Sequence, residues 1–150
     1  IGAPTIYYGD EAGVCGWTDP DNRRTYPWGR EDKDLIEYHK SLIRIHKDYE
    51  VIKTGSILFL LGEYNLISFG RFDKRDRVVV IINRGEDERH ASIPVWRLGV
   101  TYQNRMARLF MTNREGYTDE TQMYVVENGY INVTCPPVSG IIIRDIDDIM

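Results

Sequence analysis

The sequence predicts a mainly β protein in which an antiparallel β-sandwich follows a single strand–helix (βα) unit. After about Lys53, short runs of β-branched and apolar residues alternate with turn residues, as is typical of a sandwich. Before Lys53 there is one amphipathic helical pattern, preceded by an apolar, strand-like run. The chain of 150 residues is also too short for a complete (β/α)8 barrel, which needs about 250 residues.

The first expected element is a short buried strand over residues 5–8, ended by a glycine. Residues 9–29 show no hydrophobic periodicity, and a loop of that length in a compact domain usually has a function. A helix is expected over residues 34–49, with Asp32 or Asp34 supplying negative charge at its N-terminus. The stripe that recurs at helical spacing contains Leu35, His39, Leu42, His46 and Tyr49.

The second part contains a series of expected strands separated mostly by turn residues. These strands are expected at residues 56–61, 65–71, 77–83, 90–94, 106–111, 123–127, 130–135 and 140–145. Asn128-Gly129 predicts a β-hairpin that joins two of them.

We therefore expect one domain over residues 1–52 and a second over residues 53–150. One strand and one helix cannot bury both faces of a parallel-type strand, so the first part is expected to be one βα unit of something larger. The chain also begins inside an apolar run without an initiator methionine, which favours the same expectation.

Composition argues against several classes of function. Lys and Arg total 19 against 23 Asp and Glu, and the net charge of −4 does not favour a nucleic-acid partner. No apolar run is long enough to span a membrane, so no membrane partner is expected. Cys15 and Cys135 form no CxxC pair, which predicts neither a disulfide framework nor a zinc site. Two free thiols favour a reducing, cytoplasmic compartment, and we expect no metal and no cofactor.

The loop after the first expected strand combines aromatic and charged residues. Tyr8 and Trp17 can provide flat apolar platforms, while Asp19 and Arg23 can make directional hydrogen bonds to hydroxyl groups. Loops after the C-terminal ends of barrel strands form the active-site face in βα architectures. The pattern fits a sugar-binding site, and an equal alternative is that Asp19 and Arg23 only hold a long loop together.

Two segments in this region carry a family resemblance. Gly2-Ala-Pro-Thr-Ile-Tyr-Tyr-Gly-Asp-Glu11 and Asp19-Pro-Asp-Asn-Arg-Arg24, followed by Pro27-Trp28, resemble the eighth barrel strand and the following loop of glycoside hydrolase family 13, the α-amylase family. The likeness is greatest to the neopullulanase, cyclomaltodextrinase and maltogenic amylase branch. It continues through helix 34–49, which is similar to the last barrel helix, into a β domain similar to the family's domain C.

The resemblance implies that the chain is the C-terminal part of an enzyme that hydrolyses α-1,4 or α-1,6 glucosidic bonds in maltooligosaccharides or cyclodextrins. The family's catalytic Asp, Glu and Asp follow barrel strands four, five and seven, so no catalytic residue is expected in this chain and the chain itself should be inactive. Asp10 and Glu11 are poor substitutes because side chains of adjacent strand residues diverge. Asp19 and Arg23 resemble the pair that binds a glucosyl unit, with Trp17 and Tyr8 as weaker candidates.

Two other functions compete with this one: a stand-alone carbohydrate-binding β-sandwich module and a purely structural interaction domain. We also expect either a homodimer through helix 34–49 or repacking of this helix on the sandwich, because the helix would lack its barrel partners and exposed apolar patches promote association.

Overall fold

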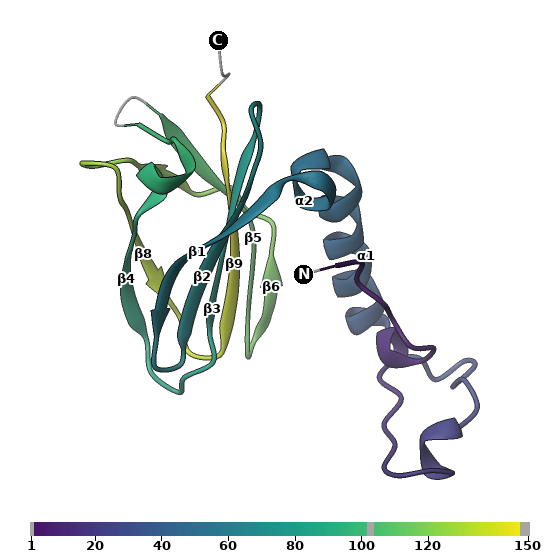
Figure 1. Cartoon of the computed structure of the whole chain (residues 1–150). Helices are drawn as coiled ribbons and strands as arrows, with labels where there is room; N and C mark the ends of the chain where they lie inside the picture. Colours follow the sequence, from purple (N-terminus) through teal and green to yellow (C-terminus); the bar gives the residue numbers. More distant parts are fainter. Residues whose placement is uncertain (1, 102–103, 148–150) are drawn as a thin grey trace. The chain divides into compact units, whose positions relative to one another are not determined.

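The computed structural model describes residues 2–101 and 104–147, and the chain divides into two compact units, Ile1–Tyr49 and Glu50–Met150 (Figure 1). The division lies slightly before the boundary expected after residue 52. The reason is the short helix α2 (Glu50–Thr54), which packs against strands of the second unit and buries Val51 almost completely.

The first unit consists of a loop with two 3-10 turns and one long helix. The turns are η1 (Asp10–Ala12) and η2 (Asp21–Arg23), and the helix is α1 (Lys33–Asp48), which confirms the helix expected over residues 34–49. Asp32 is its N-cap, since the carboxylate accepts a hydrogen bond of 2.9 Å from the backbone N–H of Leu35. No residue of α1 is buried.

The strand expected over residues 5–8 does not form. A β-strand needs a neighbouring strand for its backbone N–H and C=O groups. Among the described residues of this unit there is no strand that could pair with the segment. Residues 5–8 therefore run as irregular chain into η1.

The second unit is an antiparallel β-sandwich, which confirms the expected fold class. Its larger, seven-stranded sheet has the order β1-β2-β3-β9-β5-β6, with β7 also paired to β5. These strands are β1 (Ser56–Glu63), β2 (Leu66–Phe72), β3 (Arg77–Asn83), β5 (Arg105–Asn113), β6 (Gly116–Thr118), β7 (Met123–Val125) and β9 (Ser139–Asp145). The second sheet pairs β4 (Arg89–Ile93) with β8 (Ile131–Cys135), and both sheets are visible in Figure 1.

Alternation along the strands places the core between the two sheets. In β8 and β9 every second residue is buried, as in Ile131 and Val133 or Ile141 and Ile143. The 3-10 turn η3 (Val95–Leu98) closes one side of this core with Val95 and Leu98. In the part of the chain that the structure describes, no helix has the length and apolar character needed to cross a membrane.

The turn at Asn128-Gly129 forms, but it does not join two strands of one hairpin. Both residues have positive φ angles, of 50° and 84°, as a type I′ turn requires. Only one bridge, between Glu127 and Tyr130, flanks the turn. Before it, β7 pairs with β5 in the larger sheet; after it, β8 pairs with β4 in the smaller one. The turn thus carries the chain from one sheet to the other, because each strand pairs with a more distant partner.

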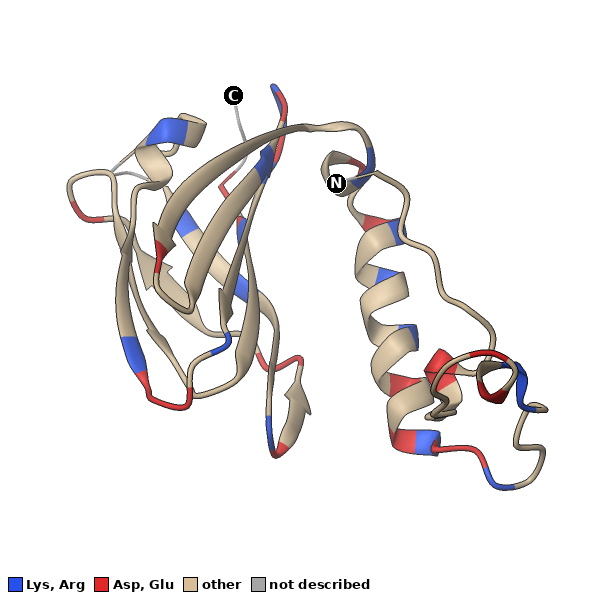
Figure 2. Cartoon of the chain, turned by 60° about the horizontal axis from the view of Figure 1, so that its bottom comes forward, with Lys and Arg blue, Asp and Glu red and all other residues tan. Residues whose placement is uncertain are grey.

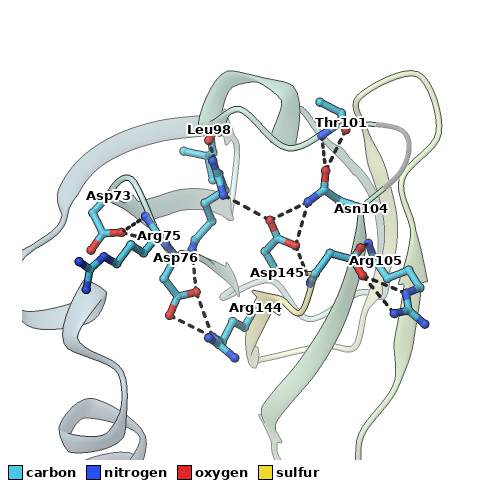
Figure 3. Close-up of polar contacts among 11 residues, drawn as sticks. Asp73, Arg75, Asp76, Leu98, Thr101, Asn104, Arg105, Arg144 and Asp145 are labelled. Carbon is cyan, nitrogen blue, oxygen red and sulfur yellow. Dashed lines mark hydrogen bonds and ion pairs between the residues drawn. The ribbon is translucent and has the colours of Figure 1, made fainter. Parts of the chain in front are cut away.

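A polar network ties together one end of the sandwich (Figure 3). The buried Asp145 carboxylate accepts hydrogen bonds from the Asn104 side chain at 3.0 and 3.2 Å and lies 3.6 Å from the Arg77 guanidinium. Arg144 and Asp76 form a second ion pair at 2.9 Å. These contacts link β3, β9 and the segment that leads into β5.

Candidate functional site

The 3-10 turn η2 brings the predicted pair Asp19 and Arg23 together. The Arg23 Nε atom lies 2.6 Å from the Asp19 Oδ1 atom; Asp19 precedes η2, and Arg23 is its last residue. Their side chains are 59% and 71% exposed, respectively. An Arg–Asp pair so open to solvent can bind a ligand, because neither group has its remaining hydrogen-bonding positions covered.

Asp21, which the sequence analysis did not single out, is the residue that organises this loop. Its carboxylate accepts a hydrogen bond of 2.9 Å from the backbone N–H of Trp17 and two from the Arg24 guanidinium, at 2.9 and 2.6 Å. The hydrogen bonds from Arg24, and then that from Trp17, hold the pKa of Asp21 below its usual value. The spacing of Asp21 and Arg24 (i, i+3) was the signal that could have identified this contact.

Gly16 allows the loop to close on itself. A Cβ atom at this position would lie 2.8 Å from the Cα atom of Asn22, closer than non-bonded carbon atoms approach. The chain therefore passes tightly against η2 immediately before Trp17. The Trp17 side chain itself remains 82% exposed.

Tyr8 has a structural contact in this loop. Its hydroxyl donates a hydrogen bond of 3.0 Å to the backbone carbonyl of Arg24, which joins the start of the loop to the segment after η2. Desolvation, followed by the neighbouring Tyr7, raises the pKa of Tyr8. The Tyr8 hydroxyl thus already donates its hydrogen bond within the loop, while the Tyr8 side chain remains half-exposed.

Asp10 and Glu11 hold backbone groups at the start of the loop. Asp10 accepts a hydrogen bond of 3.1 Å from the Tyr7 N–H, and Glu11 accepts one of 3.0 Å from the Gly9 N–H. Each carboxylate binds the chain that precedes it, as a structural role requires.

The charges of the first unit are mixed. Figure 2 shows both acidic and basic residues along the loop and α1. Over residues 2–101 and 104–147, no three His, Cys, Asp or Glu side chains lie close enough to hold a metal ion together. The exposed pair combines hydrogen-bond donors of Arg23 with acceptors of Asp19, which are the groups that hydrogen-bond to hydroxyls.

Three kinds of comparison point to one family. Residues 61–145 match the sequence profile described as "Alpha amylase, C-terminal all-beta domain". The amylopullulanase of Thermoanaerobacter thermohydrosulfuricus is 37% identical over 155 aligned positions, which cover 95% of this chain and 10% of that protein. A cyclomaltodextrinase of Geobacillus thermopakistaniensis is 35% identical over 98 positions, covering 63% of this chain and 17% of its own length.

Among solved structures, the debranching enzyme of Nostoc punctiforme superposes with a TM-score of 0.72 at 27% identity. The match covers 95% of this chain and 26% of that enzyme. The chain thus spans about a tenth to a quarter of the length of these relatives.

Proposed function

The chain belongs to the α-amylase family through its C-terminal all-β domain, and from this premise we propose that it is the C-terminal part of an α-glucan hydrolase. In this proposal, residues 1–52 are the last βα unit of the catalytic barrel and residues 53–150 are the C-terminal β domain. The amylopullulanase relative supports this arrangement, because its similarity extends over the loop, the helix and the sandwich alike.

The observation that carries the proposed role of the loop is the exposed ion pair between Asp19 and Arg23. At 2.6 Å the carboxylate and the guanidinium lie side by side, and both remain open to a ligand. A carboxylate and a guanidinium side by side match two adjacent hydroxyl groups, one donating and one accepting. We assign to Asp19 and Arg23 the binding of a glucosyl unit, with Trp17 as a stacking surface and Tyr8 as a support of the loop.

Hydrolysis requires groups that we place outside this chain. A retaining glycosidase uses two carboxyl groups about 5–5.5 Å apart, one as nucleophile and one as acid and base. Asp10 and Glu11, the candidates nearest to the loop, are both engaged with backbone N–H groups. The 150-residue chain is therefore proposed to bind but not to cleave, and the sandwich to act structurally by covering apolar surface of the barrel.

Binding can be tested on the whole chain with maltotriose and cyclomaltodextrin by calorimetry. Asp19→Ala and Arg23→Ala should each weaken binding at least about tenfold, because each removes a charge-assisted hydrogen bond to the ligand. Arg30→Ala, which removes another exposed arginine of the same loop, is the matched control and should leave affinity unchanged. Equal affinity in all three variants would contradict the assignment.

Hydrolysis can be tested in parallel by following new reducing ends. We expect no turnover by the chain alone, and measurable turnover would contradict the proposal. Replacing the corresponding segment of the amylopullulanase relative by this chain should preserve hydrolysis in that protein, and Asp19→Ala in the hybrid should lower its kcat/KM. A folded hybrid without activity would also contradict the proposal.

A further inference from the structure

A second aromatic surface lies in the sandwich unit, far along the chain from the loop with Asp19. Trp96 belongs to η3, whose neighbouring residues Val95 and Leu98 are 0% and 3% exposed. Because those two side chains are anchored in the core, the short helix cannot rotate. Trp96 is consequently directed outward, and 55% of its surface is exposed.

The backbone of the Asn128-Gly129 turn supports the base of this indole ring. The backbone N–H of Trp96 donates a hydrogen bond of 2.8 Å to the backbone carbonyl of Gly129. A Cβ atom at Gly129 would lie 2.7 Å from the Trp96 Cβ atom and 3.1 Å from Cγ. Only a glycine at position 129 therefore permits this contact. The backbone at Gly129 thus packs against one side of the Trp96 side chain.

Beside the ring is a hollow of about 400 Å³. Its lining consists of Trp96, Gly99, Val100, Thr101, Asn128 and Gly129. This volume is within the range of about 300–1,000 Å³ typical of small-ligand sites. Among the lining residues that the structure describes, none is charged, so the hollow suits a neutral ligand.

The chemistry of the lining fits a sugar ring. A pyranose offers one apolar C–H face, which stacks on an indole, and a rim of hydroxyl groups. Over residues 2–101 and 104–147, neither the Asn128 side-chain amide nor the Trp96 indole N–H has a protein hydrogen-bond partner, so both can bind hydroxyls. The Thr101 hydroxyl donates to Asn104 and still has acceptor capacity.

We propose that the hollow beside Trp96 is a second glucan-binding site, in which one glucosyl unit of an α-linked chain stacks on the Trp96 indole. The α-linkage rests on the proposed function of the whole protein. With one ring and few polar partners, a dissociation constant of about 1 mM is expected for maltoheptaose.

The test uses the three tryptophans of the ¹⁵N-labelled chain, whose indole N–H signals report Trp17, Trp28 and Trp96 separately. Titration with maltoheptaose should shift the Trp96 signal and leave that of Trp28 in place. A shift of the Trp17 signal tests binding at the proposed loop site. The two signals therefore report separately whether each site binds the ligand. A Trp96 signal that stays fixed up to about 20 mM maltoheptaose, well above the expected dissociation constant, would overturn the inference.

Substitutions provide the second readout. Trp96→Ala in the Asp19→Ala background should weaken residual maltoheptaose binding at least about tenfold, and Trp28→Ala in the same background should not. The chemical-shift dispersion in the NMR spectra of both double variants shows whether the sandwich remains folded. Unchanged affinity in the folded Trp96→Ala protein, or equal binding of cellohexaose, would refute an α-glucan site.

Discussion

The buried carboxylate of Asp145 should be among the most sensitive positions of the sandwich. Its side chain is 2% exposed, and it accepts hydrogen bonds from the Asn104 amide and the Asp147 N–H. The Arg77 guanidinium, 13% exposed, lies 3.6 Å away. Asp145→Ala removes all of these partners together and leaves the positive charge of Arg77 largely buried.

The expected loss follows from that geometry. Removing one member of a buried ion pair costs about 3–5 kcal/mol. Asp145→Ala should cost about 3 kcal/mol of unfolding free energy, the lower end of this range. The pair is separated by 3.6 Å, and Arg77 keeps its hydrogen bond of 2.7 Å to the Leu98 carbonyl. The matched control is Glu86→Ala, which breaks the exposed pair with Arg114 and should cost less than about 1 kcal/mol.

Urea unfolding of the whole chain, followed by fluorescence, measures both variants. Trp17→Phe and Trp28→Phe leave Trp96 as the only tryptophan, so the signal reports the sandwich unit alone. In a double-mutant cycle, Arg77→Ala and Asp145→Ala should couple by about 1 kcal/mol or more. A free energy of unfolding for Asp145→Ala within about 1 kcal/mol of the parent protein, or equal to that of the exposed control, would refute this reasoning.

Five further outcomes are expected. Burial raises the pKa of the Cys135 thiol to about 11, so iodoacetamide at pH 8 should alkylate the exposed Cys15 and spare Cys135, as read by mass spectrometry; equal labelling would contradict this. The thiol is held protonated in the folded state, so stability should also fall as pH rises from about 9 towards 11. Gly129→Ala forces an L side chain into φ 84° and should cost at least about 1–2 kcal/mol in urea unfolding. Asp32→Ala removes the N-cap of α1 and should lower stability by about 1 kcal/mol, with reduced helical circular dichroism. We also propose that α1 mediates a homodimer; sedimentation should show a dimer that Ile43→Glu dissociates, and a monomer at every concentration would exclude it.

Local patterns predicted most of the secondary structure. The 3.6-residue period of α1 and the short β-branched runs are properties of neighbouring residues, and the strand over Arg77–Asn83 has the expected bounds. Two short elements, β6 and α2, were not predicted. Segments of three to five residues carry little periodicity, and these two lack the run of alternating apolar residues that indicated β4 and β8. The family resemblance, read from the first residues of the chain, is confirmed by the profile match in the sandwich.

Part of the candidate site could be predicted from the sequence in the same way. Asp19 and Arg23 are four residues apart, so one turn of η2 suffices to join them. The i, i+3 spacing could have indicated the contact of Asp21 with Arg24, but two other hydrogen bonds could not be predicted. These join Asp21 to the Trp17 N–H and Tyr8 to the Arg24 carbonyl, and they depend on which backbone groups of the folded loop face the side chains. Sequence spacing does not specify those directions.

The sequence by itself determined the α-amylase relationship, the order of helix and sandwich, and the tight turn at Asn128-Gly129. The tertiary structure alone decided which strands pair across that turn, the loss of the strand expected over residues 5–8, and the exposed setting of Trp96. The physical reason is that propensity and turn chemistry act between neighbours in the chain. Strand pairing and burial depend instead on groups that only folding brings together.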